Sequence, residues 1–263
     1  MLSWSAHISL LFAEHPYAER PGHARAAGFS WVETWWPESA KDRDALARGV
    51  AEHGLRVALV NTDGGDLAAG ERGFLCDPAQ EDRARRAFLD GLALAARVGA
   101  RSLHVLVGCV PQGVSARTAH DQAAGLLREL APEAAARGVA IVVESLNEHD
   151  VPGYLAPTPE AVLDFVGEVG AGALLLDAYH LARMGRDPVA EAARAAGAIG
   201  HVQFADAPGR TAPGTGENDL WAFLDAVDAA GYDGPVGLEY DAAGDTPGSL
   251  AFLRRARAPA PFP

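Results

Sequence analysis

The sequence has few of the features that mark secreted or membrane proteins. It contains only two cysteines, Cys76 and Cys109, which are too few for a disulfide framework and fit a reducing compartment. No run of about 18 apolar residues occurs, and residues 1–9 lack a basic start followed by a long apolar stretch, so we expect neither a membrane span nor a signal peptide. These absences predict a cytoplasmic protein.

Positive charge is also scarce. The 22 lysines and arginines stand against 35 aspartates and glutamates, which gives a formal net charge of -13. A chain this acidic is repelled by phosphate backbones and by anionic lipid, so we expect no nucleic acid and no membrane among its partners. Most of the charge is expected to be a solvated surface that aids solubility.

Short β-like runs alternate with Ala-rich helical stretches along the whole chain. Its 263 residues, of which 49% are hydrophobic, suit one large α/β domain. Most of the β-like runs are almost continuously apolar, as in residues 104–107 and 141–143, which is typical of parallel strands buried on both faces. The eight runs are Ser3–Leu10, Trp31–Trp35, Arg56–Asn61, Ser102–Val107, Val139–Glu144, Ala173–Asp177, His201–Ala205 and Val236–Tyr240.

Several of the helical stretches end in a glycine just before the next predicted strand. Helices are expected over residues 81–98, 116–137, 158–169 and 218–230. A glycine that can stop a helix in the left-handed conformation stands at 28, 54, 99, 138 and 231. Eight serial βα units of this length predict a single-domain (β/α)8 TIM barrel over residues 1–257, followed by a Pro-rich tail at 258–263. The rival, an open doubly wound sheet that binds nucleotides, is disfavoured because the turn at residues 11–15 has no glycine.

Four polar residues stand at or near the ends of the last four predicted strands. They are Glu144, Asp177, Gln203 and Glu239. Strand ends converge on the axis of a closed barrel, so these side chains should meet there. Three carboxylates that share a partly buried site need a compensating cation, and an all-oxygen set favours Mg²⁺ or Mn²⁺ over zinc. For each residue alone, a helix cap or an arginine pair is an equally good interpretation, so the hypothesis depends on the set.

Further polar residues follow the predicted strands. His180 lies three residues after Asp177, and Arg210 lies in the loop after Gln203. Either can belong to the site, or be a helix-start histidine and a surface-loop arginine without a role. His7 falls in the first strand, where it can face either the site or the core. Asn61 ends the third strand beside a flexible Gly-containing loop that could help cover the site.

At this point the chain resembles the hydroxypyruvate isomerase family of xylose-isomerase-like barrels. The resemblance runs from about residue 3 to residue 240. It is carried by Gly70-Glu-Arg-Gly73, Glu144-x-x-Asn147, Asp177-x-Tyr-His180, His201-x-Gln203, Pro213-Gly-Thr-Gly-Glu217 and Gly237-x-Glu-Tyr240. The first of these motifs and the glutamine of His-x-Gln separate this branch from sugar epimerases.

The resemblance implies a role for each matching residue. Glu144 and Glu239 would be the catalytic acid/base pair, and both would bind the metal together with Asp177 and Gln203. His180 would contact substrate oxygens, as would the loop arginine after Gln203. The reaction implied is the interconversion of hydroxypyruvate and tartronate semialdehyde through an enediolate.

The chain departs from the family pattern at two positions. Ser145 stands where proline is usual and Cys109 where a lysine is common, and the second could change substrate choice. Alternatives therefore stay open: a 2-oxo-tetronate isomerase, another small-sugar isomerase or epimerase, or a non-catalytic barrel that binds sugar acids. A zinc endonuclease of the same barrel would need further histidines and a basic face. A homo-oligomer is compatible with the sequence.

Overall fold

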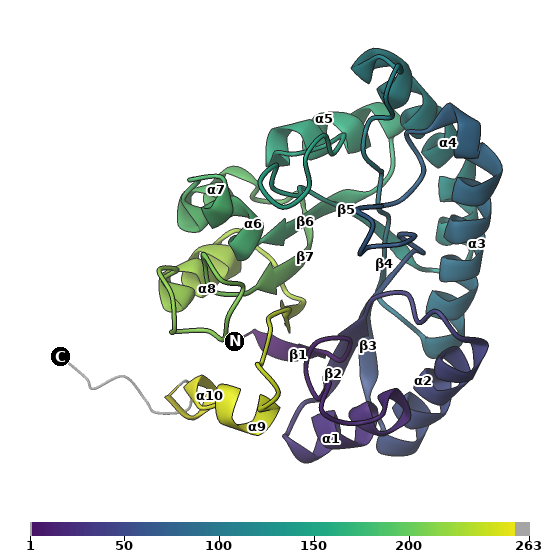
Figure 1. Cartoon of the computed structure of the whole chain (residues 1–263). Helices are drawn as coiled ribbons and strands as arrows, with labels where there is room; N and C mark the ends of the chain where they lie inside the picture. The colour runs from purple at the N-terminus through teal and green to yellow at the C-terminus, as the bar shows by residue number, and fades with distance from the viewer. Residues whose placement is uncertain (1, 256–263) are drawn as a thin grey trace.

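Eight parallel strands form a closed barrel, in which the strands pair in chain order and β8 pairs with β1 (Figure 1). The structure, a computed structural model, describes residues 2–255. It confirms the predicted (β/α)8 TIM barrel. The predicted barrel end at residue 257 and the tail at 258–263 lie outside the described residues. The strands are β1 Ser3–His7, β2 Trp31–Thr34, β3 Arg56–Asn61, β4 Ser102–His104, β5 Ala140–Glu144, β6 Ala173–Asp177, β7 Ile199–Phe204 and β8 Pro235–Leu238.

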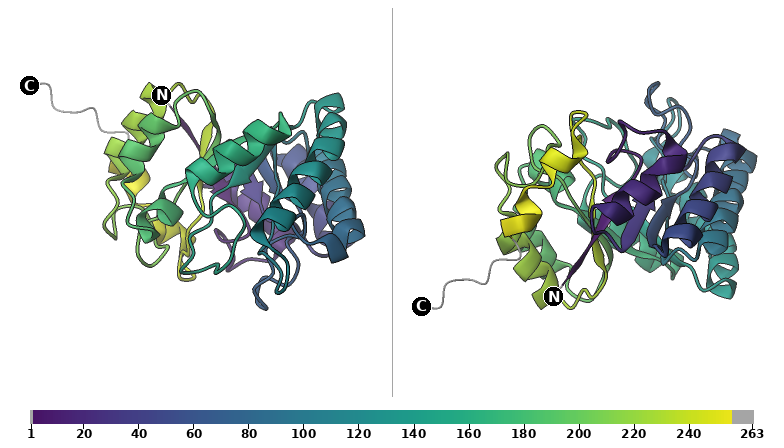
Figure 2. Two further views of the ribbon diagram at one scale, coloured as in Figure 1. Left: turned by 90° about the horizontal axis from the view of Figure 1, so that it is seen from above. Right: turned by 90° about the horizontal axis from the view of Figure 1, so that it is seen from below.

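Helices surround the strands in chain order, from α1 through α3, α4 and α5 to α8 (Figure 1), and flank them in both views of Figure 2. Within residues 2–255 no helix is long and apolar enough to cross a membrane. The helices are α1 Arg20–Ala26, α2 Ala40–His53, α3 Glu81–Val98, α4 Ala116–Ala136, α5 Pro159–Val169, α6 Ala178–Arg183, α7 Pro188–Arg194, α8 Leu220–Ala229, α9 Thr246–Ser249 and α10 Phe252–Arg255, with 3-10 turns η1 Tyr17–Glu19 and η2 Pro78–Gln80.

Local sequence signals explain where the helices begin and end. The side chain of Ser39 accepts a hydrogen bond from the backbone N–H of Asp42 and so caps the start of α2. The same helix stops at Gly54, which has a φ of 61°. All five glycines that the sequence analysis named as helix stops have positive φ, which confirms the predicted helix ends.

Five strands end earlier than predicted, β2 and β7 by one residue and three others by two or three residues. β1 ends at His7 instead of Leu10, β4 at His104 instead of Val107, and β8 at Leu238 instead of Tyr240. The apolar runs continue past the hydrogen-bonded ladder because the loops that follow are themselves buried; Val107 and Tyr240, for example, are fully buried.

The inside of the barrel has an apolar floor beneath polar strand ends. Leu59, Val142 and Leu175 belong to a small buried cluster that is separate from the main core under the helices. Each lies two residues before a polar strand end, at Asn61, Glu144 and Asp177 respectively. Since side chains in a strand alternate with a period of two, these pairs face the same way, into the barrel. The polar ends therefore lie directly above the apolar floor.

Candidate active site

A cavity of about 400 Å³ opens at the carboxyl ends of the strands. Glu144, His180, Arg210 and Glu239 line it, together with Asn61 from the end of β3. This is where the active sites of (β/α)8 barrels are found. The structure therefore brings five of the predicted site residues to one cavity.

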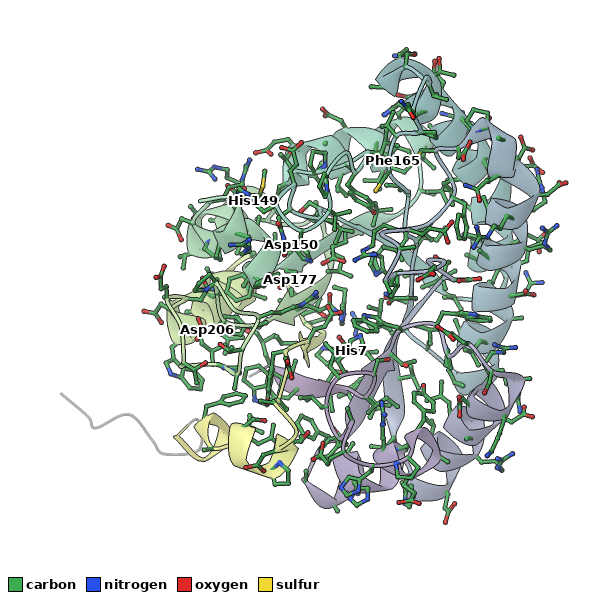
Figure 3. All side chains as sticks on the ribbon, viewed as in Figure 1. His7, His149, Asp150, Phe165, Asp177 and Asp206 are labelled. Carbon is green, nitrogen blue, oxygen red and sulfur yellow. The ribbon has the colours of Figure 1, made fainter. Side chains whose placement is uncertain are left out.

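The carboxylates of β5 and β6 lie close together. Ligand atoms of Glu144, Asp177 and His180 all lie within 4.8 Å of one another, and all three side chains are buried. Figure 3 shows Asp177 and His7 at the strands, inside the layer of helices, and the exposed His149 farther out. Asp177 itself does not line the cavity.

Gln203 is held in one orientation by Glu33, a fully buried residue of β2 that the sequence analysis did not single out. The Gln203 amide Nε2 donates to Glu33 Oε1 over 2.8 Å, and the other Glu33 oxygen lies 3.1 Å from His201 Nε2. A carboxylate only accepts, so the NH₂ of Gln203 must face it. Gly237 on β8 makes room for Glu33, because a Cβ there would overlap the carboxylate. The carbonyl oxygen of Gln203 is left without a hydrogen bond.

His180 is oriented by Asn147. The backbone N–H of Asn147 donates to His180 Nδ1 over 3.1 Å, so Nδ1 is the acceptor and the ring proton of the neutral imidazole lies on Nε2. That N–H lies 3.6 Å from Glu144 Oε1 and 3.9 Å from Asp177 Oδ2. Burial, and then the charge of Arg210, lower the pKa of His180 to about 3. His180 is therefore a neutral donor, suited to a substrate oxygen and unsuited to a metal.

Glu239 has two partners at its carboxylate. Trp35 Nε1 donates to Oε1 over 2.7 Å, and Arg210 Nη2 lies 3.1 Å from Oε2. The same Arg210 nitrogen lies 3.7 Å from Asp177 Oδ2. The position of Trp35 is thus explained by a hydrogen bond to a predicted catalytic group as well as by burial.

The acidic groups differ in their affinity for protons. Burial, and then the charges of Glu239 and Asp177, raise the pKa of Glu144 well above its ordinary value. Burial also raises the pKa of Asp177 to about 7 against the opposing charge of Arg210. Burial pushes the pKa of Glu239 upward too, but Arg210 and then His7 outweigh it and lower that pKa to about 2. Two glutamates with pKa values pushed apart are a common basis for acid and base roles.

Three of the four predicted metal ligands carry a buried oxygen without a hydrogen bond, whereas both carboxylate oxygens of Glu239 already face donors, from Trp35 and Arg210. Glu144 Oε1, Asp177 Oδ2 and Gln203 Oε1 are all buried, and none accepts a hydrogen bond within residues 2–255. Buried oxygens without a donor are costly unless a cation or water satisfies them. Three such oxygens on adjacent strands fit an oxygen-preferring divalent cation.

The remaining predicted residues are placed as follows. Asn61 lines the cavity and its Oδ1 has no donor in the described chain. His7 faces the site rather than the core: its Nε2 lies 3.6 Å from Glu239 Oε1, although it does not line the cavity. His104, which the sequence analysis treated as part of an apolar run, also lines the cavity, and its Nε2 lies 3.6 Å from Glu144 Oε2.

Comparisons with known proteins agree with this architecture. The profile of the xylose isomerase-like TIM barrel family matches residues 22–256. A Streptomyces coelicolor protein, provisionally named hydroxypyruvate isomerase, is 39% identical over 95% of this chain and 94% of its own. The hydroxypyruvate isomerase of Escherichia coli is 33% identical over 96% of this chain and 98% of its own. The 2-oxo-tetronate isomerase of Cupriavidus necator is 32% identical over 97% of this chain and 98% of its own.

A solved structure supports the same assignment. A Brucella melitensis protein named AP endonuclease, family 2, superposes with a TM-score of 0.91 at 32% identity and covers 98% of this chain and 100% of its own. The chain therefore belongs to the xylose isomerase-like TIM barrel family, as its resemblance to hydroxypyruvate isomerases predicted, and is an aldose–ketose isomerase-like enzyme.

Proposed function

We propose that the protein interconverts hydroxypyruvate and tartronate semialdehyde by metal-assisted proton transfer. The observation that carries the proposal is a pair of buried glutamates, Glu144 from β5 and Glu239 after β8, which line one cavity beside three unpaired ligand-type oxygens. The names of the Escherichia coli and Streptomyces coelicolor relatives support the same substrate.

Glu144, Asp177, Gln203 and Glu239 would hold the cation, with Mg²⁺ or Mn²⁺ favoured by the all-oxygen donor set. When bound there, the cation would act as a Lewis acid on the substrate oxygens. Its charge would also relieve the repulsion that raises the pKa of Glu144.

The side chains supply the proton transfers. Moving the carbonyl to the neighbouring carbon requires that a proton leaves one carbon and that a proton is added to the adjacent carbon, the roles assigned to the two glutamates. The proton of the original hydroxyl must also pass to the former carbonyl oxygen, so that a hydroxyl forms there while the new carbonyl forms next to it. The Nε2–H of His180 is placed to donate to a substrate oxygen, and Arg210 stabilises negative charge that develops on the enediolate. Acid/base groups in such positions contribute about 10²- to 10⁴-fold in rate.

The test follows hydroxypyruvate by proton NMR in deuterated buffer with Mg²⁺ or Mn²⁺, and then after chelation. We expect metal-dependent isomerisation with uptake of deuterium at carbon. Isomerisation that continues unchanged after chelation would contradict the metal-assisted route. The absence of any reaction with metal present would contradict the choice of hydroxypyruvate as the substrate.

Two variants test the acid/base pair. We expect Glu144→Gln and Glu239→Gln each to lose turnover while circular dichroism shows an intact fold. Glu191→Gln is a matched control, because Glu191 is buried but pairs with Arg186 on the outside of the barrel. Near-normal activity in both site variants would refute their assignment.

The second candidate is a 2-oxo-tetronate isomerase, which is favoured by the Cupriavidus necator relative. Both reactions need the same pair of glutamates, so comparing turnover of the three-carbon and the four-carbon oxo-acid separates them. A barrel that only binds sugar acids would show metal and ligand binding without deuterium uptake.

A further inference from the structure

One basic residue of the cavity has no part in the chemistry described so far. Arg72 lies on the loop between β3 and α3 and lines the same cavity as Glu144. Its Nη1 donates to the carbonyl oxygens of Leu67 and Glu71, over 2.8 and 2.7 Å. Its Nε and Nη2 make no hydrogen bond to any residue between 2 and 255, so they remain available for a ligand.

The loop that carries this guanidinium is fixed in place. Glu71 forms two hydrogen bonds with Arg83 of α3, over 3.0 and 3.1 Å. The N–H of Gly73 donates to the carbonyl of Gly64 over 3.0 Å, which closes the base of the loop. Gly73 also has a φ of 90° and packs so closely on the Leu106 carbonyl that a Cβ would overlap it. The guanidinium is therefore presented to the cavity before any ligand binds.

The other basic groups of the cavity already face carboxylates of the site. His104 Nε2 and His180 Nε2 each lie 3.6 Å from an oxygen of the Glu144 carboxylate, so both already face an acidic group. Arg210 lies 3.1 Å from the carboxylate of Glu239. No carboxylate of the described chain comes within 4.0 Å of Arg72, which leaves this arginine as a lining cation without an ionic partner there.

We propose that Arg72 binds the carboxylate of the substrate, and that the site therefore selects small hydroxy-keto acids over neutral sugars. This inference rests on the proposed function, because it assumes that the hydroxyl and keto oxygens of the substrate, between which the carbonyl moves, face Glu144 and Glu239. The carboxylate at the other end of the molecule then faces the loop. Two free N–H groups on one planar guanidinium match the two oxygens of a carboxylate.

The test measures binding of D-glycerate by calorimetry in the presence of Mg²⁺. Glycerate has the size and the carboxylate of the proposed substrate but no ketone or aldehyde group, so it is not isomerised, and glycerol is its neutral counterpart. We expect glycerate to bind the wild type more tightly than glycerol does, and Arg72→Gln to bind glycerate about 10- to 100-fold more weakly, as the loss of a charged hydrogen bond predicts.

Two further variants make the result specific. Arg117→Gln removes one positive charge from an exposed i,i+4 pair on α4 and should bind glycerate as the wild type does. Arg72→Lys keeps the charge without the planar fork and should restore part of the affinity. With hydroxypyruvate, Arg72→Gln should raise KM more than it lowers kcat.

The inference is overturned if Arg72→Gln binds glycerate as tightly as the wild type, or if the wild type binds glycerate no better than glycerol. Neither measurement needs turnover. Failure of the proposed isomerisation would therefore be seen separately, in the NMR assay of the wild type.

Discussion

Replacing Glu33 with methionine should weaken metal binding although Glu33 is not expected to touch the metal. Glu33 accepts from Gln203 Nε2 and faces His201 Nε2, and these contacts leave the Gln203 carbonyl oxygen unpaired. Methionine has a similar length but accepts no comparable hydrogen bond. In Glu33→Met nothing holds the amide of Gln203, so its NH₂ can turn toward the cation position and displace the ligand oxygen.

The magnitude follows from the two contacts. Removing a residue that orients a metal ligand typically costs about 10- to 100-fold in metal affinity, or about 1.4–2.7 kcal/mol. The protein should also lose about 1–3 kcal/mol of stability for each buried donor left unsatisfied. Glu33→Gln should lose less metal affinity than Glu33→Met, because its amide oxygen still accepts from Gln203 if His201 takes the other tautomer.

The assay is a calorimetric titration with Mn²⁺, combined with thermal unfolding without metal. Glu191→Met is the matched control: it removes a buried glutamate that pairs with Arg186 and Arg194 outside the barrel interior, so it should destabilise the fold and keep the metal affinity. If Glu33→Met is as destabilised as Glu191→Met but binds Mn²⁺ like the wild type, the orienting role of Glu33 is wrong.

Three more outcomes are expected. Burial raises the pKa of Asp177 from 3.8 to about 7, so without a cation this group's contribution to stability is lost as the pH rises from the first value to the second. A cation must displace its proton, and Mn²⁺ should therefore raise Tm more at pH 8 than at pH 6, whereas equal shifts would contradict the proton competition. Trp35→Phe removes a 2.7 Å hydrogen bond to Glu239 and should lower kcat about tenfold or more; unchanged kcat would show that the bond has no catalytic part. Gly73→Ala forces a Cβ onto the Leu106 carbonyl at a positive φ, so Tm and glycerate affinity should both fall; if they do not, the loop is not rigid.

The sequence was enough to predict the barrel, because parallel strands buried on both faces appear in it as apolar runs. The ends of the helices are marked by glycines. The ends of some strands could not be predicted in this way. In residues 102–107 the apolar pattern continues beyond the last ladder residue, His104, because the loop that follows is buried as deeply as the strand. Hydrophobicity reports burial and does not report hydrogen bonding between strands.

The site was predictable where polar residues interrupt an apolar run near its end, as at Glu144 and Asp177. Glu33 gave no such signal, because its role depends on strands β7 and β8, which are far from it in sequence. His104 was hidden at the start of an apolar run, and only the closed ladder shows that it ends its strand. Contacts across the barrel axis depend on strand order and register, which a single sequence does not reveal.

The pairing of β8 with β1 also determines when the site can first exist during synthesis of the chain. Ser3 pairs with Pro235 and Ala6 with Leu238. The first strand to be synthesised therefore lacks one of its two neighbours until the last strand has been made. A nascent chain that ends before β8 already contains Glu144, Asp177 and Gln203, but it has an open wall and lacks Glu239. The complete set of four candidate ligands therefore exists only once β8 has closed the barrel against β1.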